Sequence, residues 1–183
     1  MQGQPTMEVV CPTTQIMEHI VTLPDNAPLD AVKRWQNAIA EMAQGYNADP
    51  ELHVVFDVPH DEIVISRNIQ FSSLCEHHLF PFFGTADVAY IPRDRIVGLS
   101  KLARTVECYA RRFQTQERLS SDIANAIENA LSPLAVAVII KATHTCQKCR
   151  GICKEGEMLT SVMRGAFRTE PSARAELLEL LKL

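Results

Sequence analysis

Two short segments rich in metal-binding side chains, far apart in the chain, place the strongest constraint on its fold. The first is Cys75-Glu76-His77-His78, and the second is His144-Thr145-Cys146. Two thiols and an imidazole form a soft nitrogen and sulfur donor set, which is the set that zinc prefers. Three protein ligands leave the fourth tetrahedral position open, as in catalytic zinc sites. The fold is therefore expected to join these segments around a catalytic Zn²⁺.

Spacing alone leaves two questions about this site open. Either His77 or His78 can be the ligand, and the other can orient it or carry protons beside the metal. Cys149 and Cys153 follow Cys146 closely, so a closed, cysteine-rich structural zinc site is an alternative. A further alternative to a metal site is that the cysteines are simply buried in the core and the histidine is unrelated to them.

The composition excludes several classes of protein. The chain has 183 residues, 46% of them hydrophobic and 22% charged, which suits one globular domain with a sizeable core. Its formal net charge of −4 argues against a nucleic-acid or membrane-surface binder. The first residues lack the pattern of a secretory signal, and six cysteines then indicate thiols or metal ligands of a cytoplasmic protein.

Periodicity predicts an α+β protein with an antiparallel sheet. Residues 1–27 are expected to form an irregular arm, with a short strand over 16–23, before a single domain over 28–183. The patterns predict helices over 28–45, 99–113, 116–131 and 171–183, and strands over 62–71, 79–91, 134–142 and 158–167. Strands in pairs, separated by paired helices, are typical of α+β folds. Both metal-binding segments follow the end of a strand.

Other segments could bind an anion or a purine. Gly98-Leu99-Ser100-Lys101 opens a predicted helix, where backbone N–H groups and a lysine suit phosphate, although serine is also a common helix cap. Arg104 and Arg150 add cations, or are ordinary surface residues. Gln116-Glu117 could bind the edge of a purine, or Glu117 could stabilise the start of its helix.

Four of these motifs, in this order, resemble the GTP cyclohydrolase I family. The resemblance covers about residues 28–183 and lies in Ser73–Leu79, Gly98–Arg104, Gln116–Leu119 and Thr143–Gly151. It implies the tunnelling fold, an antiparallel sheet with paired helices that assembles into pentameric barrels and a decamer. Active sites would lie between subunits of this homo-oligomer.

The resemblance also implies a role for each candidate residue. Cys75, His78 and Cys146 would bind Zn²⁺, and His77 and His144 would transfer protons, with Ser100 near the ribose. The substrate-binding residues would be Gln116 and Glu117 for guanine, and Lys101, Arg104, Arg150 and Lys33 for the phosphates. The implied reaction is hydrolysis of GTP at C8, which gives formate and 7,8-dihydroneopterin triphosphate for pterin or tetrahydrofolate biosynthesis.

The chain departs from the family pattern at three places. Its N-terminal region is short, Cys149 and Cys153 are unusual, and Asp30 stands where a cation is expected near the triphosphate. Because a carboxylate repels phosphate, a related cyclohydrolase acting on another guanine nucleotide is one alternative. A non-catalytic zinc-binding protein on the same fold is the second, and it leaves His77, His144, Gln116 and Glu117 without a purpose.

Overall fold

The computed structural model describes residues 29–182, and the chain divides into two compact units, residues 1–41 and 42–183. The described part of the first unit lies in helix α2, Leu29–Met42, whose last residue belongs to the second unit. In this helix Arg34 pairs with Asp30 one turn away. The predicted arm, with its strand over 16–23, lies outside the described residues. The predicted boundary at residue 28 stays a prediction.

The second unit is built on a five-stranded sheet in the order β5-β2-β3-β6-β7. Its long strands are β2 (Val64–Cys75), β3 (Pro81–Ile91), β6 (Ala135–His144) and β7 (Met158–Gly165), and each pairs antiparallel with its neighbour. The short β5 (Phe113–Gln114) runs parallel to the end of β2. The antiparallel α+β prediction is therefore confirmed for the chain itself.

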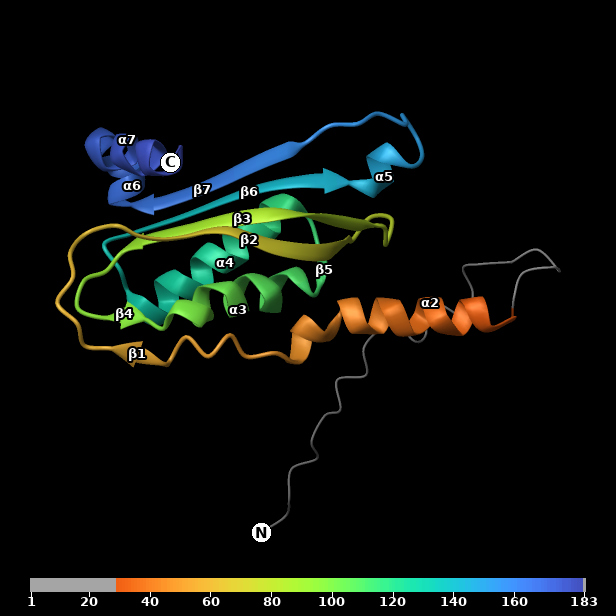
Figure 1. Cartoon of the computed structure of the whole chain (residues 1–183), viewed down its shortest axis with the longest axis horizontal. Helices are drawn as coiled ribbons and strands as arrows, with labels where there is room; N and C mark the ends of the chain where they lie inside the picture. The colour runs from red at the N-terminus through yellow and green to blue at the C-terminus, as the bar shows by residue number, and fades with distance from the viewer. Residues whose placement is uncertain (1–28, 183) are drawn as a thin grey trace, which may run out of the picture. The chain divides into compact units, whose positions relative to one another are not determined.

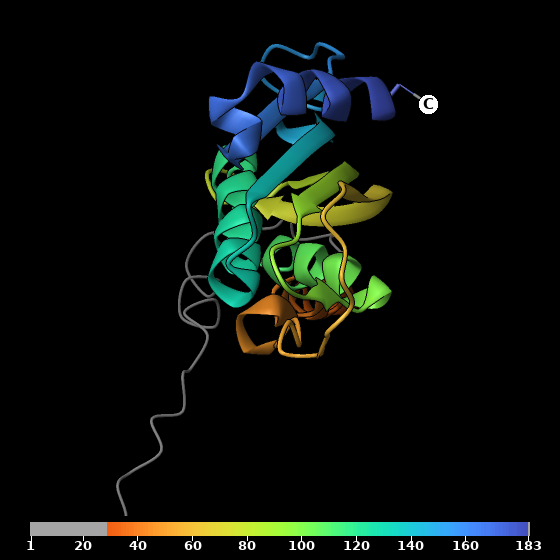
Figure 2. The ribbon, with the colours of Figure 1, turned by 90° about the vertical axis from the view of Figure 1, so that its left-hand side faces the viewer.

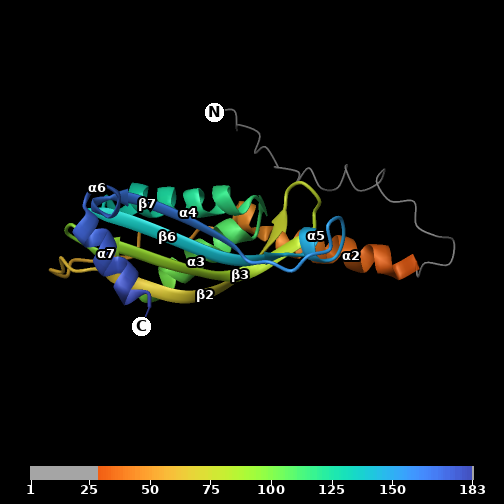
Figure 3. The same cartoon turned by 90° about the horizontal axis from the view of Figure 1, so that it is seen from above.

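Helices cover both faces of this sheet (Figures 1 and 2). Helices α3 (Leu99–Ala110) and α4 (Gln116–Leu131) lie side by side on one face and enclose the main core. On the other face α7 (Pro171–Leu180) lies across one end of the strands, with α5 (Thr145–Lys148) at the opposite end (Figure 3). β6 is buried on both faces, because its even residues face the main core and its odd residues face a smaller one with α6 (Ala166–Thr169) and α7.

A small second sheet lies at the start of α3. Strand β1 (Val55–Phe56) pairs antiparallel with β4 (Ile96–Val97), and Gly98 then begins α3 without a capping side chain. The 3-10 helix η1 (Gln44–Asn47) packs near the other end of α3, where the Gly45 N–H donates to the Arg111 carbonyl. The segment between η1 and β4 is thus attached to both ends of α3, through η1 at the end of the helix and through β1 at its start.

Local chemistry explains where the predicted elements were too long or too short. The helix predicted over 99–113 ends at Ala110, and its last predicted residue, Phe113, begins β5 instead. The strand predicted over 158–167 ends at Gly165, whose φ of +56° breaks the strand before α6. β2 extends past its predicted end to Cys75. Two-residue strands and one-turn helices carry no periodicity, so the sequence does not reveal them.

Candidate metal centre and substrate site

Two neighbouring strand ends bring the metal-binding segments together. Cys75 is the last residue of β2, and Cys146 lies in α5, directly after β6. The strand between them, β3, pairs antiparallel with both β2 and β6. These two strands therefore finish at the same end of the sheet. A tight turn returns the chain after β2, where the Leu79 N–H donates to the Cys75 carbonyl at 2.8 Å and Leu79 adopts a φ of +56°. This turn places His78 beside Cys75.

Cys75, His78 and Cys146 form a group that could hold a metal ion. Their ligand atoms all lie within 4.8 Å of one another, and Cys75 Sγ lies 3.9 Å from His78 Nδ1. In a tetrahedral zinc site, bond lengths of about 2.0–2.3 Å set ligand atoms about 3.3–3.8 Å apart. A small contraction would therefore bring these three ligand atoms to the separations of a zinc site. The structure favours His78 over His77 as the ligand, because His78 alone joins both cysteines.

Electrostatics also suits a cation at this position. Burial, and then the neighbouring Cys75, raise the pKa of the Cys146 thiol, and the charge of Arg150 opposes them weakly. Two adjacent thiols resist becoming two adjacent thiolates unless a positive ion compensates them. A bound dication reverses this preference, which is the behaviour expected of a metal site.

His144 is held in place by two contacts, one on the face of its ring and one at its edge. Its ring stacks on Phe82, its cross-strand neighbour, with centroids 4.6 Å apart and planes within 6°. Its Nε2 lies 2.9 Å from Oε1 of Gln116, the first residue of α4. Burial lowers the pKa of His144, although the carboxylate of Glu117 opposes that shift. The imidazole is thus fixed and favoured in its neutral form.

The side-chain amide of Gln116 is committed inside the protein. Gln116 is only 1% exposed, and its Nε2 contacts the carbonyls of Ile140 and Met158 at 3.0 and 2.9 Å and Thr160 Oγ1 at 3.2 Å. These three acceptors fix the orientation of the amide, so Oε1 must face His144. Because an amide oxygen only accepts, the His144 proton is assigned to Nε2. Gln116 therefore acts on His144, a link that sequence spacing does not reveal.

The residues around the possible metal site line one open cavity of about 240 Å³. It contains the three metal-ligand candidates together with His77, His144, Gln116 and Glu117. The His77 side chain is 64% exposed, with Nδ1 3.8 Å from Cys75 Sγ and Nε2 3.9 Å from a Glu76 oxygen. Seven residues predicted from separate motifs thus share one surface.

The predicted phosphate-binding residues of α3 lie elsewhere. Ser100 and Lys101 are in its first turn and Arg104 in its second, beside β4 (Figure 1). Cys75 is beside β5, which follows the other end of α3. From Lys101 to Ala110, nine residues of helix span about 14 Å. One chain therefore holds two separate groups of predicted site residues.

Comparison with known proteins identifies the family of this chain. The family model of GTP cyclohydrolase I matches residues 12–182. The GTP cyclohydrolase 1 of Rhodopirellula baltica is 50% identical over 171 residues, which cover 91% of this chain and 75% of that protein. The chain belongs to the GTP cyclohydrolase I family. The Geobacillus kaustophilus and Bacillus subtilis proteins of the same name are 47% and 46% identical, and each match covers at least 91% of both chains.

The two unusual cysteines, Cys149 and Cys153, lie outside the metal group. Cys149 and Cys153 are exposed free thiols in the turn after α5, and among residues 29–182 no further group of metal-ligand side chains gathers. The cysteine-rich structural alternative is thus not supported. Arg150 is exposed between them, near Cys146. Lys33 and Asp30 lie on α2, in the first unit.

Two residues near these groups were missed by the sequence reasoning. Phe82 orients His144, and Glu51 contacts both Lys101 and Arg104. Neither belongs to a motif, and only the folded chain brings them to their partners.

No helix among residues 29–182 is long and apolar enough to cross a membrane.

Proposed function

We propose that the protein is a zinc-dependent GTP cyclohydrolase I, which hydrolyses GTP at C8 of guanine to formate and 7,8-dihydroneopterin triphosphate. The observation that supports this most is the shared cavity, in which a metal-binding triad meets His77, His144 and Glu117. Its two thiols and one imidazole match the donors that zinc prefers. A non-catalytic zinc protein would not need an oriented, neutral histidine beside the metal.

The chain's own residues can supply the proton transfers. When bound, Zn²⁺ is a Lewis acid that activates water near neutral pH. Gln116 holds the proton of His144 on Nε2, so the free Nδ1 can accept a proton from the attacking water and pass it on to N7 of guanine. His77, exposed at the mouth of the cavity, can serve the second hydrolysis and formate release. Later ring opening, rearrangement and closure also move protons, so two histidines are useful.

Guanine recognition is assigned to Glu117 together with Gln116. The exposed carboxylate of Glu117 can accept two parallel N–H bonds from the edge of guanine. With its amide committed to the protein, Gln116 contributes to the subsite by forming its wall and fixing His144. Ser100 would lie near the ribose, and Lys101, Arg104, Arg150 and Lys33 would bind the phosphates.

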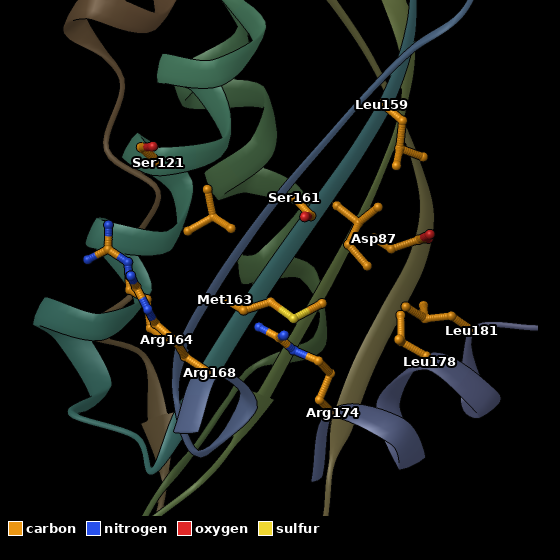
Figure 4. Close-up of a pocket in the computed structure, with 12 residues that line it drawn as sticks. Asp87, Ser121, Leu159, Ser161, Met163, Arg164, Arg168, Arg174, Leu178 and Leu181 are labelled. Atoms are coloured by element: carbon orange, nitrogen blue, oxygen red, sulfur yellow. The ribbon is translucent and has the colours of Figure 1, made fainter. Parts of the chain in front are cut away.

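The separation of the two groups supports an active site shared between subunits. The α3 residues of one chain would complete the metal cavity of another. Both sheet edges are available for this association, because among residues 29–182 β7 pairs only with β6, and β2 pairs with β5 only at Leu74 and Cys75. A cavity of about 1060 Å³ flanks β7, lined by Ser121 of α4 on one side and Leu178 of α7 on the other (Figure 4). We propose that sheets join edge to edge into pentameric barrels that stack as a decamer.

Product analysis tests the proposed activity. Protein loaded with zinc is incubated with GTP, formate is measured, and the oxidised product is examined for pterin fluorescence. We expect both products in equal amounts, and fully loaded protein that releases neither would overturn the proposal. Parallel assays with GDP and GMP test the alternative substrate that Asp30 suggests. Sedimentation of the same sample tests the decamer.

A further inference from the structure

One carboxylate contacts both phosphate-binding candidates of α3. Glu51 Oε2 pairs with Lys101 Nζ, and its Oε1 lies 3.4 Å from Arg104 Nη1. The Lys101 side chain is only 11% exposed, and no other acidic group pairs with Lys101 or Arg104 among the described residues. The hydrogen bond from Lys101, and then the charge of Arg104, lower the pKa of Glu51, so its carboxylate stays ionised near neutral pH.

Glu51 has a backbone conformation that glutamate rarely adopts. Its φ of +58° is in the left-handed region, which glycine or asparagine adopts more readily than glutamate. The Glu51 N–H donates to Asp49 Oδ1 at 2.7 Å, and its carbonyl accepts from the Val54 N–H at 3.1 Å. Leu52 beside it is buried in the main core. A strained conformation kept by its surroundings is typical of functional positions.

The neighbouring backbone fixes this turn beside the start of α3. The Val54 carbonyl accepts from the Gly98 N–H at 3.3 Å, and Val55 pairs with Val97 in the small sheet. Gly98 has no side chain to cap α3, so the helix start offers N–H groups that favour an anion. The Glu51 carboxylate thus supplies negative charge where the proposed function requires phosphate.

We propose that Glu51 is a specificity-determining residue that occupies Lys101 and Arg104 in the resting protein and competes with the nucleotide's phosphates for them. This inference rests on the proposed function for the identity of the nucleotide. When phosphate binds, the carboxylate releases both cations and turns to solvent, which its 38% exposed side chain permits. The apparent Kd for phosphate is then the intrinsic Kd divided by the fraction of protein in which the two cations are free.

Neutralising Glu51 tests the competition directly. In Glu51→Gln, we expect KM for GTP to fall about threefold to tenfold, because the cations no longer have an internal partner. Titration with inorganic tripolyphosphate, with zinc content checked before and after, should show a Kd lower by a similar factor. The Kd for guanosine, which has no phosphate, should stay unchanged. Glu51→Gly also removes the charge and accepts the positive φ, so it should give the same result in a well-folded protein.

A matched control removes one negative charge elsewhere on α3. Glu107 pairs with Arg111 near the other end of this helix, and Glu107→Gln should leave all three constants unchanged. A tripolyphosphate Kd that is unchanged or higher in Glu51→Gln would overturn the proposal, as would an equal change for guanosine. If wild-type protein releases no formate from GTP, the proposed function fails, while the tripolyphosphate titration still decides the role of Glu51.

Discussion

The metal cavity and the start of α3 are two contrasting parts of one proposed active site. The cavity is built at the ends of paired strands, and its critical side chains are held by buried contacts such as the stacking of His144 on Phe82. The start of α3 is held by a surface turn and by ion pairs to Glu51. We infer that the chemical part is ready before substrate arrives, whereas the phosphate-binding part must first exchange one anion for another.

Removing a metal ligand should have the largest effect on activity, because it disrupts the metal cavity itself. Cys146→Ala leaves two of the three ligand candidates, so we expect loss of zinc and a fall in activity of about 10³-fold or more. The measurements are zinc content and formate release. Cys149→Ala is the matched control, since Cys149 is an exposed free thiol outside the group. Zinc retained at full occupancy in Cys146→Ala would show that the ligand assignment is wrong.

Replacing the buried amide should show how far the cavity depends on a fixed histidine. Gln116→Met keeps the side chain's length but removes every hydrogen bond of the side chain, including the one to His144. We expect kcat to fall about 10- to 100-fold and stability to fall by about 2–4 kcal/mol, because buried carbonyls lose their donor. Denaturant unfolding and steady-state kinetics measure the two effects. Unchanged zinc content would separate this role from metal binding, and an unchanged kcat would contradict it.

How much could be read from the sequence differs between the two parts. Strand periodicity and the Cys-His spacing predicted that the segments of Cys75 and Cys146 would meet, because strand ends in one sheet are brought together by pairing, while the choice of His78 over His77 came from the family resemblance. The motifs also named His144 and Gln116. Their hydrogen bond was missed, since it joins the end of β6 to the start of α4 and depends on how those elements pack.

Around α3 the motif was visible but its partner was not. Ser100 and Lys101 were predicted at a helix start, and they lie there. Glu51 is in a turn between η1 and β1, where neither strand nor helix periodicity exists. Its positive φ and its two ion pairs are properties of the folded chain alone. Contacts between segments without a repeating pattern are therefore the part that sequence reasoning leaves out.

A smaller effect is expected where the sheet supports the start of α3. The hydroxyl of Tyr90, which is fully buried, accepts a hydrogen bond from the Val97 N–H at 3.1 Å. Tyr90→Phe leaves that N–H without a partner, so stability should fall by about 1–3 kcal/mol with kcat nearly unchanged. KM for GTP should rise slightly, since Val97 directly precedes the first turn of α3. A large fall in kcat would contradict the separation of the two parts.

The pH dependence of this variant provides a second check. Burial raises the pKa of Tyr90 above its ordinary value near 10, so folding favours the neutral phenol. A raised folded pKa stabilises the protein below the unfolded pKa, and that contribution disappears as pH rises through the folded value. Unfolding measured between neutral pH and about pH 11 should therefore show the wild type losing its advantage over Tyr90→Phe at the alkaline end. A difference in unfolding free energy between the two proteins that stays constant with pH would show that folding does not favour the neutral phenol of Tyr90.

The smallest effect should come from Asp30, which stands where the resemblance predicts a cation. Asp30 is exposed and pairs with Arg34 on the same helix, so part of its charge is already compensated. Asp30→Asn should change stability by less than about 0.5 kcal/mol, as for other exposed pairs one turn apart. KM for GTP should fall less than twofold, because solvent and salt screen an exposed charge. If KM falls further than in Glu51→Gln, then Asp30, and not Glu51, is the main carboxylate opposing the phosphates.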